Sequence, residues 1–245
     1  MLEGMYTAAA GLAAQQQRLD ALSNDVANVS TVGYQRMRVA FRDLVYTASG
    51  PGGQPGVMEG SGAAVSTIGR GGTGASLENT GNSLDVAIQG DGYLQVTQPD
   101  GTTALTRAGS LSIDSQRRLL ANGLPLQPPV QVPNGVDETK LAIAPDGAVT
   151  SADGQAVGTI RLFSVRSPDR LQAIGGNLLL PTQASGAATP AGAATTLQQG
   201  VLETSDVDMA DVMSDMVMTQ RNYSMASQAI KTQDQMAEIA NGVKR

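Results

Sequence analysis

The fold is decided by the last stretch of the chain, residues 205–245, which reads SDVDMADVMSDMVMTQRNYSMASQAIKTQDQMAEIANGVKR. It contains no proline and a single glycine, Gly242, so little in it interrupts a helix. Apolar or small residues recur along it, and the last four are spaced seven residues apart: Val212, Met216, Tyr223, Ile230 and Ala237. A stripe at this spacing predicts a long amphipathic helix that needs a partner helix.

The first thirty residues carry a second stripe that matches the first. Its members are Met5, Ala8, Leu12, Leu19, Leu22, Val26 and Val29. We predict a helix over residues 1–32, with Ser30 and Gly33 ending it. Asn24 and Asn28 are four residues apart and share a helix face, which suggests amide hydrogen bonds at a seam between subunits. At the other end of the chain, Ser205 and Asp208 fit a variant capping box that begins the C-terminal helix.

Composition excludes several classes of function. The 245 residues contain no cysteine and no histidine, which removes thiolate nucleophiles and the commonest metal ligands. The net charge of −6 argues against a nucleic-acid partner, because phosphate binding needs clustered Lys and Arg. No apolar run approaches the roughly twenty residues of a membrane span. Residues 1–17 carry no Lys or Arg, so we expect export without a cleavable signal peptide. We expect no cofactor and no metal.

The region after the first helix changes character twice. Residues 35–45 partly alternate polar and apolar side chains, which favours a short strand or an extended arm. Residues 46–81 are rich in glycine and are expected to form an extended loop. Its run Gly69–Gly74 resembles a phosphate-binding loop but lacks the Gly-Lys-Ser/Thr ending, so phosphate binding is not expected.

Residues 82–183 predict an all-β region. Short apolar or alternating runs, such as Leu84–Ile88 and Thr159–Val165, are separated by Asp-Gly and Asn-Gly turn signals. Several aspartates invite the interpretation of a two-carboxylate glycosidase, but each lies beside a turn glycine, where Asp is favoured for local backbone bonding. These aspartates are Asp91, Asp100, Asp146 and Asp153. Residues 184–196 are small and low in complexity and predict a linker or exposed loop.

The fold class is therefore α+β. Residues 1–45 and 200–245 would form a terminal helical assembly domain in which the two helices pair as a coiled coil. Residues 46–81 would be the glycine-rich arm, and residues 82–199 the central β domain. An isolated helix of this kind is marginal in water, so we expect both termini to be largely disordered in the free subunit and to fold on assembly.

At this point the motifs resemble a known family. The opening LEGMYTAAAGL (2–12) with LSNDVANVSTVGY (22–34), the central DVAIQGDGYL (85–94) with TRAGSL (106–111), and the closing GVLETSDVDM (200–209) with QRNY (220–223) resemble bacterial flagellar basal-body rod and hook proteins. The resemblance spans nearly the whole chain in the family's order. Within the family, the opening and the glycine-rich insertion are most similar to the distal rod member.

The resemblance implies a structural axial subunit of the flagellum and no enzyme. Such subunits are exported unfolded by the flagellar type III apparatus and polymerise helically to transmit torque from the motor to the hook. The implied partners are further copies of the chain, adjacent rod, hook and ring proteins, and the export apparatus. The implied location is the extracytoplasmic rod of the basal body.

Two alternatives remain open from the residues alone. One is a proximal rod or hook subunit of the same family, and the other is a secreted wall-binding or wall-degrading β protein. For the polymer, the hypothetical subunit-assembly residues are Met5, Leu12, Leu19, Asn24, Val26, Asn28, Gly33, Val212, Met216, Gln220, Tyr223 and Ile230.

Overall fold

A computed structural model describes residues 2–44, 46–48, 58–60, 62–70, 75–192 and 194–243. Packing divides the chain into two units, and each is treated by itself below. Unit 1 contains Met1–Ala27, Met37–Ile68 and Asp208–Arg245. Unit 2 contains Asn28–Arg36 and Gly69–Val207.

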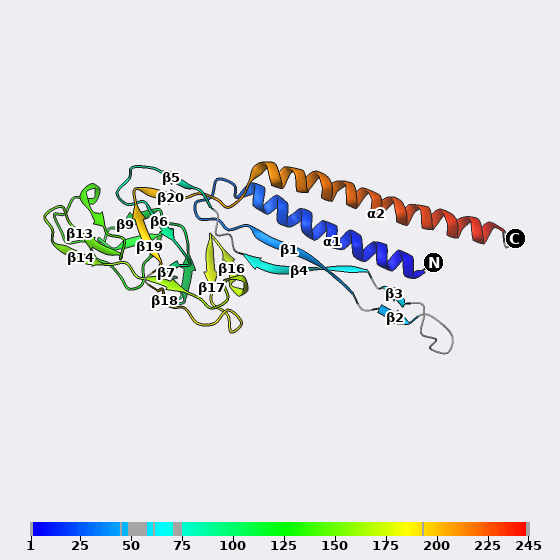
Figure 1. Ribbon diagram of the computed structural model, residues 1–245, viewed down its shortest axis with the longest axis horizontal. Helices are drawn as coiled ribbons and strands as arrows, with labels where there is room; N and C mark the ends of the chain where they lie inside the picture. Colours follow the sequence, from blue (N-terminus) through cyan, green and yellow to red (C-terminus); the bar gives the residue numbers. More distant parts are fainter. Residues whose placement is uncertain are drawn as a thin grey trace. The chain divides into compact units, whose positions relative to one another are not determined.

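The two terminal helices of unit 1, α1 (Leu2–Ala27) and α2 (Met209–Val243), pack against each other (Figure 1). They run antiparallel. The side chain of Gln233, near the end of α2, lies against Gly4, near the start of α1. Further along the pair, Arg18 of α1 forms an ion pair of 3.5 Å with Asp215 of α2. The predicted pairing of the chain's two ends is confirmed.

The start of α2 differs from the prediction. The Asp208 carboxylate accepts hydrogen bonds from the backbone N–H groups of Ala210 (2.8 Å) and Asp211 (3.3 Å), so Asp208 caps the helix. Ser205 was predicted as the capping residue, but it lies four residues before Met209 and the first turn begins after Asp208. The capping assignment to Ser205 is therefore wrong.

The end of α1 also differs from the prediction. The helix ends at Ala27, not at residue 32, because the following residues bond to each other in turns. The backbone N–H of Thr31 donates to the carbonyl of Asn28 (3.0 Å), and that of Tyr34 donates to the carbonyl of Thr31 (3.2 Å). Asn28 thus lies just outside the helix, so the argument that it shares a helix face with Asn24 fails.

Strands complete unit 1. Strand β1 (Met37–Asp43) pairs with β4 (Ala63–Arg70), and β2 (Tyr46–Ala48) pairs antiparallel with β3 (Met58–Gly60). Gly62, which directly precedes β4, lies close to Thr7 of α1, so the β1–β4 pair covers one side of that helix. The predicted strand within 35–45 is confirmed.

The glycine-rich range 46–81 was expected as an extended loop, yet most of its described residues are in strands. They form β2, β3, β4 and β5 (Leu77–Asn79). Short β-forming runs between the glycines, such as Ala63–Ile68, account for the pairing. The remaining glycine clusters, 49–57 and 71–74, lie outside the described residues.

Unit 2 is built mainly around a six-stranded antiparallel sheet in the order β16-β17-β8-β7-β15-β18. These strands are β7 (Tyr93–Thr97), β8 (Thr103–Thr106), β15 (Leu162–Ser164), β16 (Gln172–Gly175), β17 (Leu178–Leu180) and β18 (Thr189–Pro190). One edge strand, β18, is two residues long and contains a proline. The other, β16, has a register shift between Ala173 and Gly175.

Smaller sheets surround this one. Two have three strands: β9 (Leu111–Ile113), β10 (Leu119–Ala121) and β11 (Leu124–Pro125), then β12 (Ala142–Ile143), β13 (Ala148–Thr150) and β14 (Ala156–Thr159). Two have two strands: β6 (Val86–Gln89) with β19 (Thr196–Gln199), and β5 with β20 (Val201–Glu203). Single 3₁₀ turns form at Glu138–Lys140 and Pro168–Arg170.

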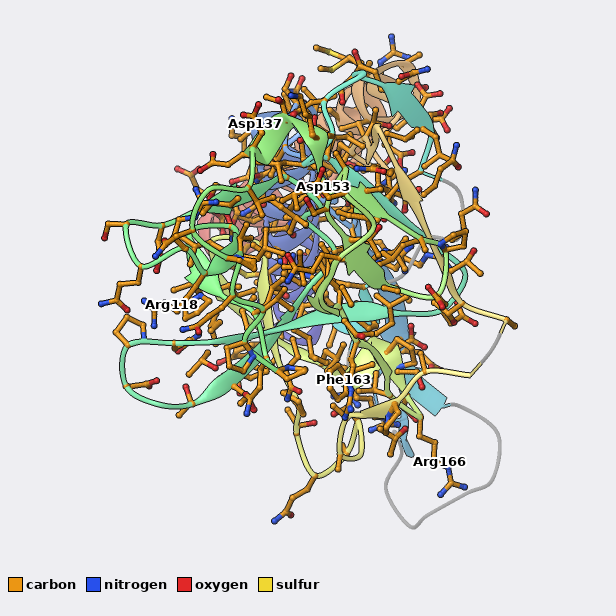
Figure 2. The ribbon with its side chains drawn as sticks, turned by 90° about the vertical axis from the view of Figure 1, so that its left-hand side faces the viewer. Arg118, Asp137, Asp153, Phe163 and Arg166 are labelled. Atoms are coloured by element: carbon orange, nitrogen blue, oxygen red, sulfur yellow. The ribbon has the colours of Figure 1, made fainter. Side chains whose placement is uncertain are left out.

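The core of unit 2 is mainly aliphatic. Its largest fully buried hydrophobic side chains are Leu94, Leu105, Leu119, Val86, Val96 and Val149. The predicted runs around residues 84–88 and 159–165 supply β6 and β15, which confirms the all-β prediction. Phe163 on β15, labelled in Figure 2, pairs in register with Tyr93 of β7.

Candidate assembly surface

The seam between α1 and α2 includes small and polar residues beside apolar ones. A Cβ added to Gly4 would lie 2.6 Å from Nε2 of Gln233, so glycine at this position allows the two helices to approach. On α2, Val212 and Thr219 are fully buried, and Thr219 donates its hydroxyl to the carbonyl of Asp215 (2.7 Å). Val212, Thr219, Ala226 and Gln233 follow one another at intervals of seven residues. Heptad spacing is therefore present, but polar and small residues occupy several of its positions.

The hypothetical assembly residues of α2 fall into two groups. Val212 is buried, while Met216 and Ile230 are half-buried along the seam. Gln220 is exposed, and Tyr223 keeps 41% of its surface exposed. Tyr223 was placed in the apolar stripe that a partner helix covers, but α1 does not cover it in this chain.

The hypothetical assembly residues of α1, and Asn28 in the turn after it, are half-buried or exposed. Half-buried side chains spaced seven residues apart follow the helix: Met5, Leu12, Leu19 and Val26. Asn24 is exposed, and Asn28 is half-buried and accepts a hydrogen bond from the Thr31 hydroxyl (3.1 Å). Ala14, which is buried on α1, was not among the predicted assembly residues.

The helix pair leaves much apolar surface open. Large hydrophobic residues with at least a third of their surface exposed gather on the two helices: Tyr6 on α1, and Met209, Met213, Val217, Met218, Tyr223, Met225, Met236 and Ile239 on α2. Met218, Met225 and Met236 are 59%, 64% and 51% exposed and have spacings of seven and eleven residues. Exposed apolar side chains gathered along one helix indicate an interaction surface, and methionine suits packing against non-equivalent neighbours.

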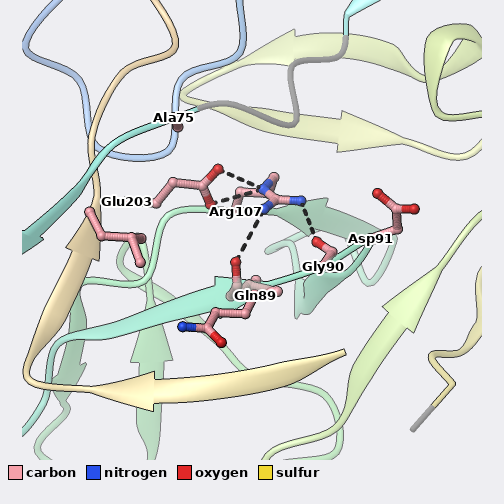
Figure 3. Close-up of a pocket in the computed structure, with 8 residues that line it drawn as sticks. Ala75, Gln89, Gly90, Asp91, Arg107 and Glu203 are labelled. Carbon is pink, nitrogen blue, oxygen red and sulfur yellow. Dashed lines mark hydrogen bonds and ion pairs between the residues drawn. The ribbon is translucent and has the colours of Figure 1, made fainter. Parts of the chain in front are cut away.

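Unit 2 contains a buried ion pair between Arg107 and Glu203. The Arg107 Nε lies 2.9 Å and 3.1 Å from the two Glu203 carboxylate oxygens, and the side chains are only 11% and 6% exposed. The Arg107 guanidinium also donates to the carbonyls of Gly90 (3.2 Å), Gly92 (3.3 Å) and Ile88 (3.3 Å). Figure 3 shows Arg107 between Glu203 and the backbone near Gly90. Removing one partner of such a pair costs about 3–5 kcal/mol because a buried charge is left without its counterion.

Burial is the main influence on the pKa values of the ionisable groups at this pair. It raises the pKa of the Glu203 carboxyl, and the neighbouring Arg107 charge opposes that rise without cancelling it. Burial likewise raises the pKa of Tyr93, whose ring centroid lies 5.8 Å from the Arg107 guanidinium carbon. A shallow depression of about 290 Å³ adjoins the pair. The Arg107 donors are aimed at protein oxygens, which makes the pair a structural clamp.

Gly33, the remaining hypothetical assembly residue, lies at this clamp. Its φ of +65° is in the left-handed region, and its backbone N–H donates to the carbonyl of Glu203 (2.8 Å). A Cβ at this position would lie 2.7 Å from the carbonyl carbon and oxygen of Arg107. Glycine is required here both by conformation and by space.

The aspartates considered as glycosidase acids lie in turns. Asp100 accepts hydrogen bonds from the Thr102 backbone (2.9 Å) and hydroxyl (2.7 Å), which lower its pKa. Asp146 accepts from the backbone of Ala148 (3.0 Å). Asp153 is exposed, and Figure 2 shows it on the same side of unit 2 as Asp137. The turn interpretation is confirmed for Asp100 and Asp146.

Among the described residues, no group of three or more Asp or Glu side chains gathers where a metal ion would bind. No described helix is both long and apolar enough to cross a bilayer.

A terminal helix pair with exposed apolar side chains and a β unit together fit a structural subunit. Known proteins match the chain throughout. Three family models match: "Flagella basal body rod protein" over residues 5–35, "Flagellar hook protein FlgE/F/G D1 domain" over 87–151, and "Flagellar basal body rod FlgEFG protein C-terminal" over 198–243. The chain belongs to the flagellar basal-body rod protein family and is a structural subunit of the rod.

Several curated relatives align with the whole chain. The flagellar basal-body rod protein FlgG of Borreliella burgdorferi is 35% identical over 264 residues, with all of both chains covered. FlgG of Caulobacter vibrioides is 36% identical, covering 99% of this chain and 100% of its own. FlgG of Buchnera aphidicola subsp. Acyrthosiphon pisum is 36% identical, covering 97% of this chain and 98% of its own.

Proposed function

We propose that this chain is the distal rod subunit of the flagellum, which polymerises helically and transmits torque from the motor to the hook. Its partners are then further copies of itself, neighbouring rod, hook and ring proteins, and the type III export apparatus that carries it unfolded. The observation that supports this most is the exposed apolar surface of the helix pair, above all Met218, Met225 and Met236. The full-length similarity to FlgG relatives supports the rod position.

The proposed assembly contacts use both helices. One copy offers the open flank of α2, and neighbouring copies cover it with their own helices, so that each contact is heterologous and the array does not close. Burying the exposed side chains supplies roughly 25 cal/mol per Å² of apolar area. The half-buried Met5, Leu12, Leu19 and Val26 on α1, and the exposed Tyr223 on α2, are further assembly residues in this proposal.

The test replaces the α2 stripe in a strain that lacks its own copy of the gene. The variant Met218→Gln, Met225→Gln, Met236→Gln keeps side-chain length and removes apolar surface. Swimming in soft agar and electron microscopy of purified basal bodies are the measurements. We expect basal bodies without a complete rod and no motility. The control exchanges exposed polar residues of the same helix, Gln228→Asn and Gln235→Asn, and should swim normally.

Two results would contradict the proposal. Complete rods in the triple variant would show that the open flank of α2 is not an assembly surface. Imaging of labelled subunits in purified basal bodies decides the position, and a label at the motor end of the rod would favour the proximal subunit instead.

The disorder of the helices in the free subunit is part of the same proposal. The seam between α1 and α2 buries few large apolar side chains, so its contribution to pairing in a lone chain is small. We expect the amides of Leu22 and Val212 to exchange quickly in the free subunit and slowly in the polymer. Strong protection of both amides in the free subunit would show that the helix pair is already formed before assembly.

A further inference from the structure

Two short segments link unit 2 to the terminal helices in sequence. Residues 28–36 follow α1 and residues 200–207 precede α2, yet both pack as part of unit 2. Two backbone hydrogen bonds join them directly. Gly33 N–H donates to the Glu203 carbonyl (2.8 Å), and Asp206 N–H donates to the Tyr34 carbonyl (3.0 Å). The two segments therefore lie side by side although they are far apart in the chain.

Arg107 lies at the centre of this junction. Its side chain neutralises the buried Glu203 carboxylate and binds the carbonyls of the Ile88–Gly92 turn, while its backbone packs against Gly33. Each linking segment thus has a contact with Arg107. Thr204, the residue after Glu203, also anchors the second segment. Its backbone N–H and its hydroxyl both donate to the carbonyl of Ser76, each at 2.9 Å.

We propose that Arg107 is a positioning residue for assembly: it holds the two linking segments together in the free subunit, before the terminal helices order. Without Arg107 the Glu203 carboxylate would be buried with no counterion. The Glu203 carboxylate would then move into solvent. This movement would pull β20 away from its place and break the backbone hydrogen bond between Gly33 and Glu203. With Arg107 in place, the C-terminal end of the α1 segment and the N-terminal end of the α2 segment are held close together while both segments are still disordered. Each segment is then present at a high effective concentration for the other, so the two can pair locally.

This inference rests on the proposed function only in the statement that the helices order during polymerisation. Its test uses the free full-length subunit and three amides of unit 2. Gly33 and Asp206 report on the junction, and Leu119, whose N–H donates to Val130 (3.0 Å), reports on the core. The helix amides of Leu22 and Val212 report on the proposed function separately, so the two can fail independently.

In the wild-type subunit we expect all three amides of unit 2 to be protected from hydrogen exchange. In Arg107→Gln, Gly33 and Asp206 should exchange faster by on the order of a hundredfold, because local opening of the junction becomes much easier. Leu119 should change little. The matched control is Arg118→Gln, which breaks a more exposed Arg–Asp pair of 2.8 Å in the same unit and should leave Gly33 and Asp206 protected.

A conservative variant covers the case in which Arg107→Gln fails to fold. Arg107→Lys keeps the charge but loses the planar fork, so it should loosen the junction less than Arg107→Gln while unit 2 stays folded. Unchanged protection of Gly33 and Asp206 in either folded variant would overturn the proposal. So would an equal loss of protection at Leu119, since Arg107 would then stabilise unit 2 as a whole and not the junction.

Discussion

The backbone N–H of Gly33 donates to the carbonyl oxygen of Glu203 over 2.8 Å, and this bond joins the segment after the first helix to the segment before the last. Gly33 reaches that position in a left-handed conformation and leaves no space for a side chain next to Arg107. The family's N-terminal and C-terminal motifs are thus in direct contact within unit 2.

The first prediction concerns the two requirements placed on Gly33. Gly81 has a similar φ, +68° against +65°, but nothing lies within 4 Å of its added Cβ. Gly81→Ala should therefore lower the free energy of unfolding by only about 1 kcal/mol, which is the strain of an alanine in the left-handed conformation. Gly33→Ala should lower the free energy of unfolding by about 1–3 kcal/mol more, because its added methyl group would overpack against the Arg107 backbone. Urea unfolding of unit 2 in the full chain measures both, and equal losses would show that the contact with Arg107 relaxes without cost.

The cap of α2 gives a second prediction. Asp208→Ala should reduce the helix stability by about 1 kcal/mol, since two backbone N–H groups lose their acceptor. Circular dichroism of peptides spanning the C-terminal helix measures this. Ser205→Ala is the matched control, because the Ser205 hydroxyl is buried without a hydrogen-bond partner among the described residues. A larger loss of helicity from Ser205→Ala would return the capping role to the serine.

A third prediction separates assembly from folding. Ile230→Asp places a charge on the half-buried face of α2 and should block polymerisation while unit 2 keeps its unfolding midpoint. Lys231→Asp introduces the same side chain at the next, exposed position and should assemble more readily. Rods that form normally with Ile230→Asp would mean that the seam between α1 and α2 tolerates a charge at this position.

The fourth prediction concerns pH. Burial raises the pKa of Glu203 above its ordinary value of 4.5. The folded state therefore binds its proton more tightly than the unfolded state. The resulting stabilisation is present below the unfolded pKa and is lost as the pH rises through the raised folded pKa. Glu203→Gln lacks this contribution.

The measurement is the difference in unfolding free energy between wild type and Glu203→Gln over a series of pH values from acid to neutral. We expect the wild type to lose stability relative to the variant as the pH rises. The other carboxylates, including Asp100 and Asp114 with their lowered pKa values, are common to both proteins and cancel. A difference that grows in the opposite direction would mean that the Arg107 charge outweighs burial at Glu203.

The sequence predicted the elements whose signals are local. Both terminal helices were expected because their apolar stripes are long, and the Asp100 and Asp146 turns were expected from the glycines beside them. The residues that form the seam of the helix pair were not predicted. Gly4, Thr219 and Gln233 give no apolar signal, although they face the partner helix. Small size and hydrogen bonding, not hydrophobicity, fit those positions.

Long-range pairing was also beyond the sequence pattern. Nothing local indicates that Arg107 meets Glu203, because the two residues lie in separate motifs that are 96 residues apart in the chain. The strands within residues 46–81 were missed because glycine enrichment obscured the short β-forming runs between the glycines.

The edges of the six-stranded sheet have a consequence for subunits that have been made but not yet incorporated. An open sheet edge can recruit strands from other chains and lead to amyloid-like aggregation. Here β18 offers only two residues, one of them Pro190, and the register shift in β16 distorts the opposite edge. Uncontrolled strand addition is thus disfavoured at both ends of the sheet, and a concentrated pool of subunits can remain dispersed.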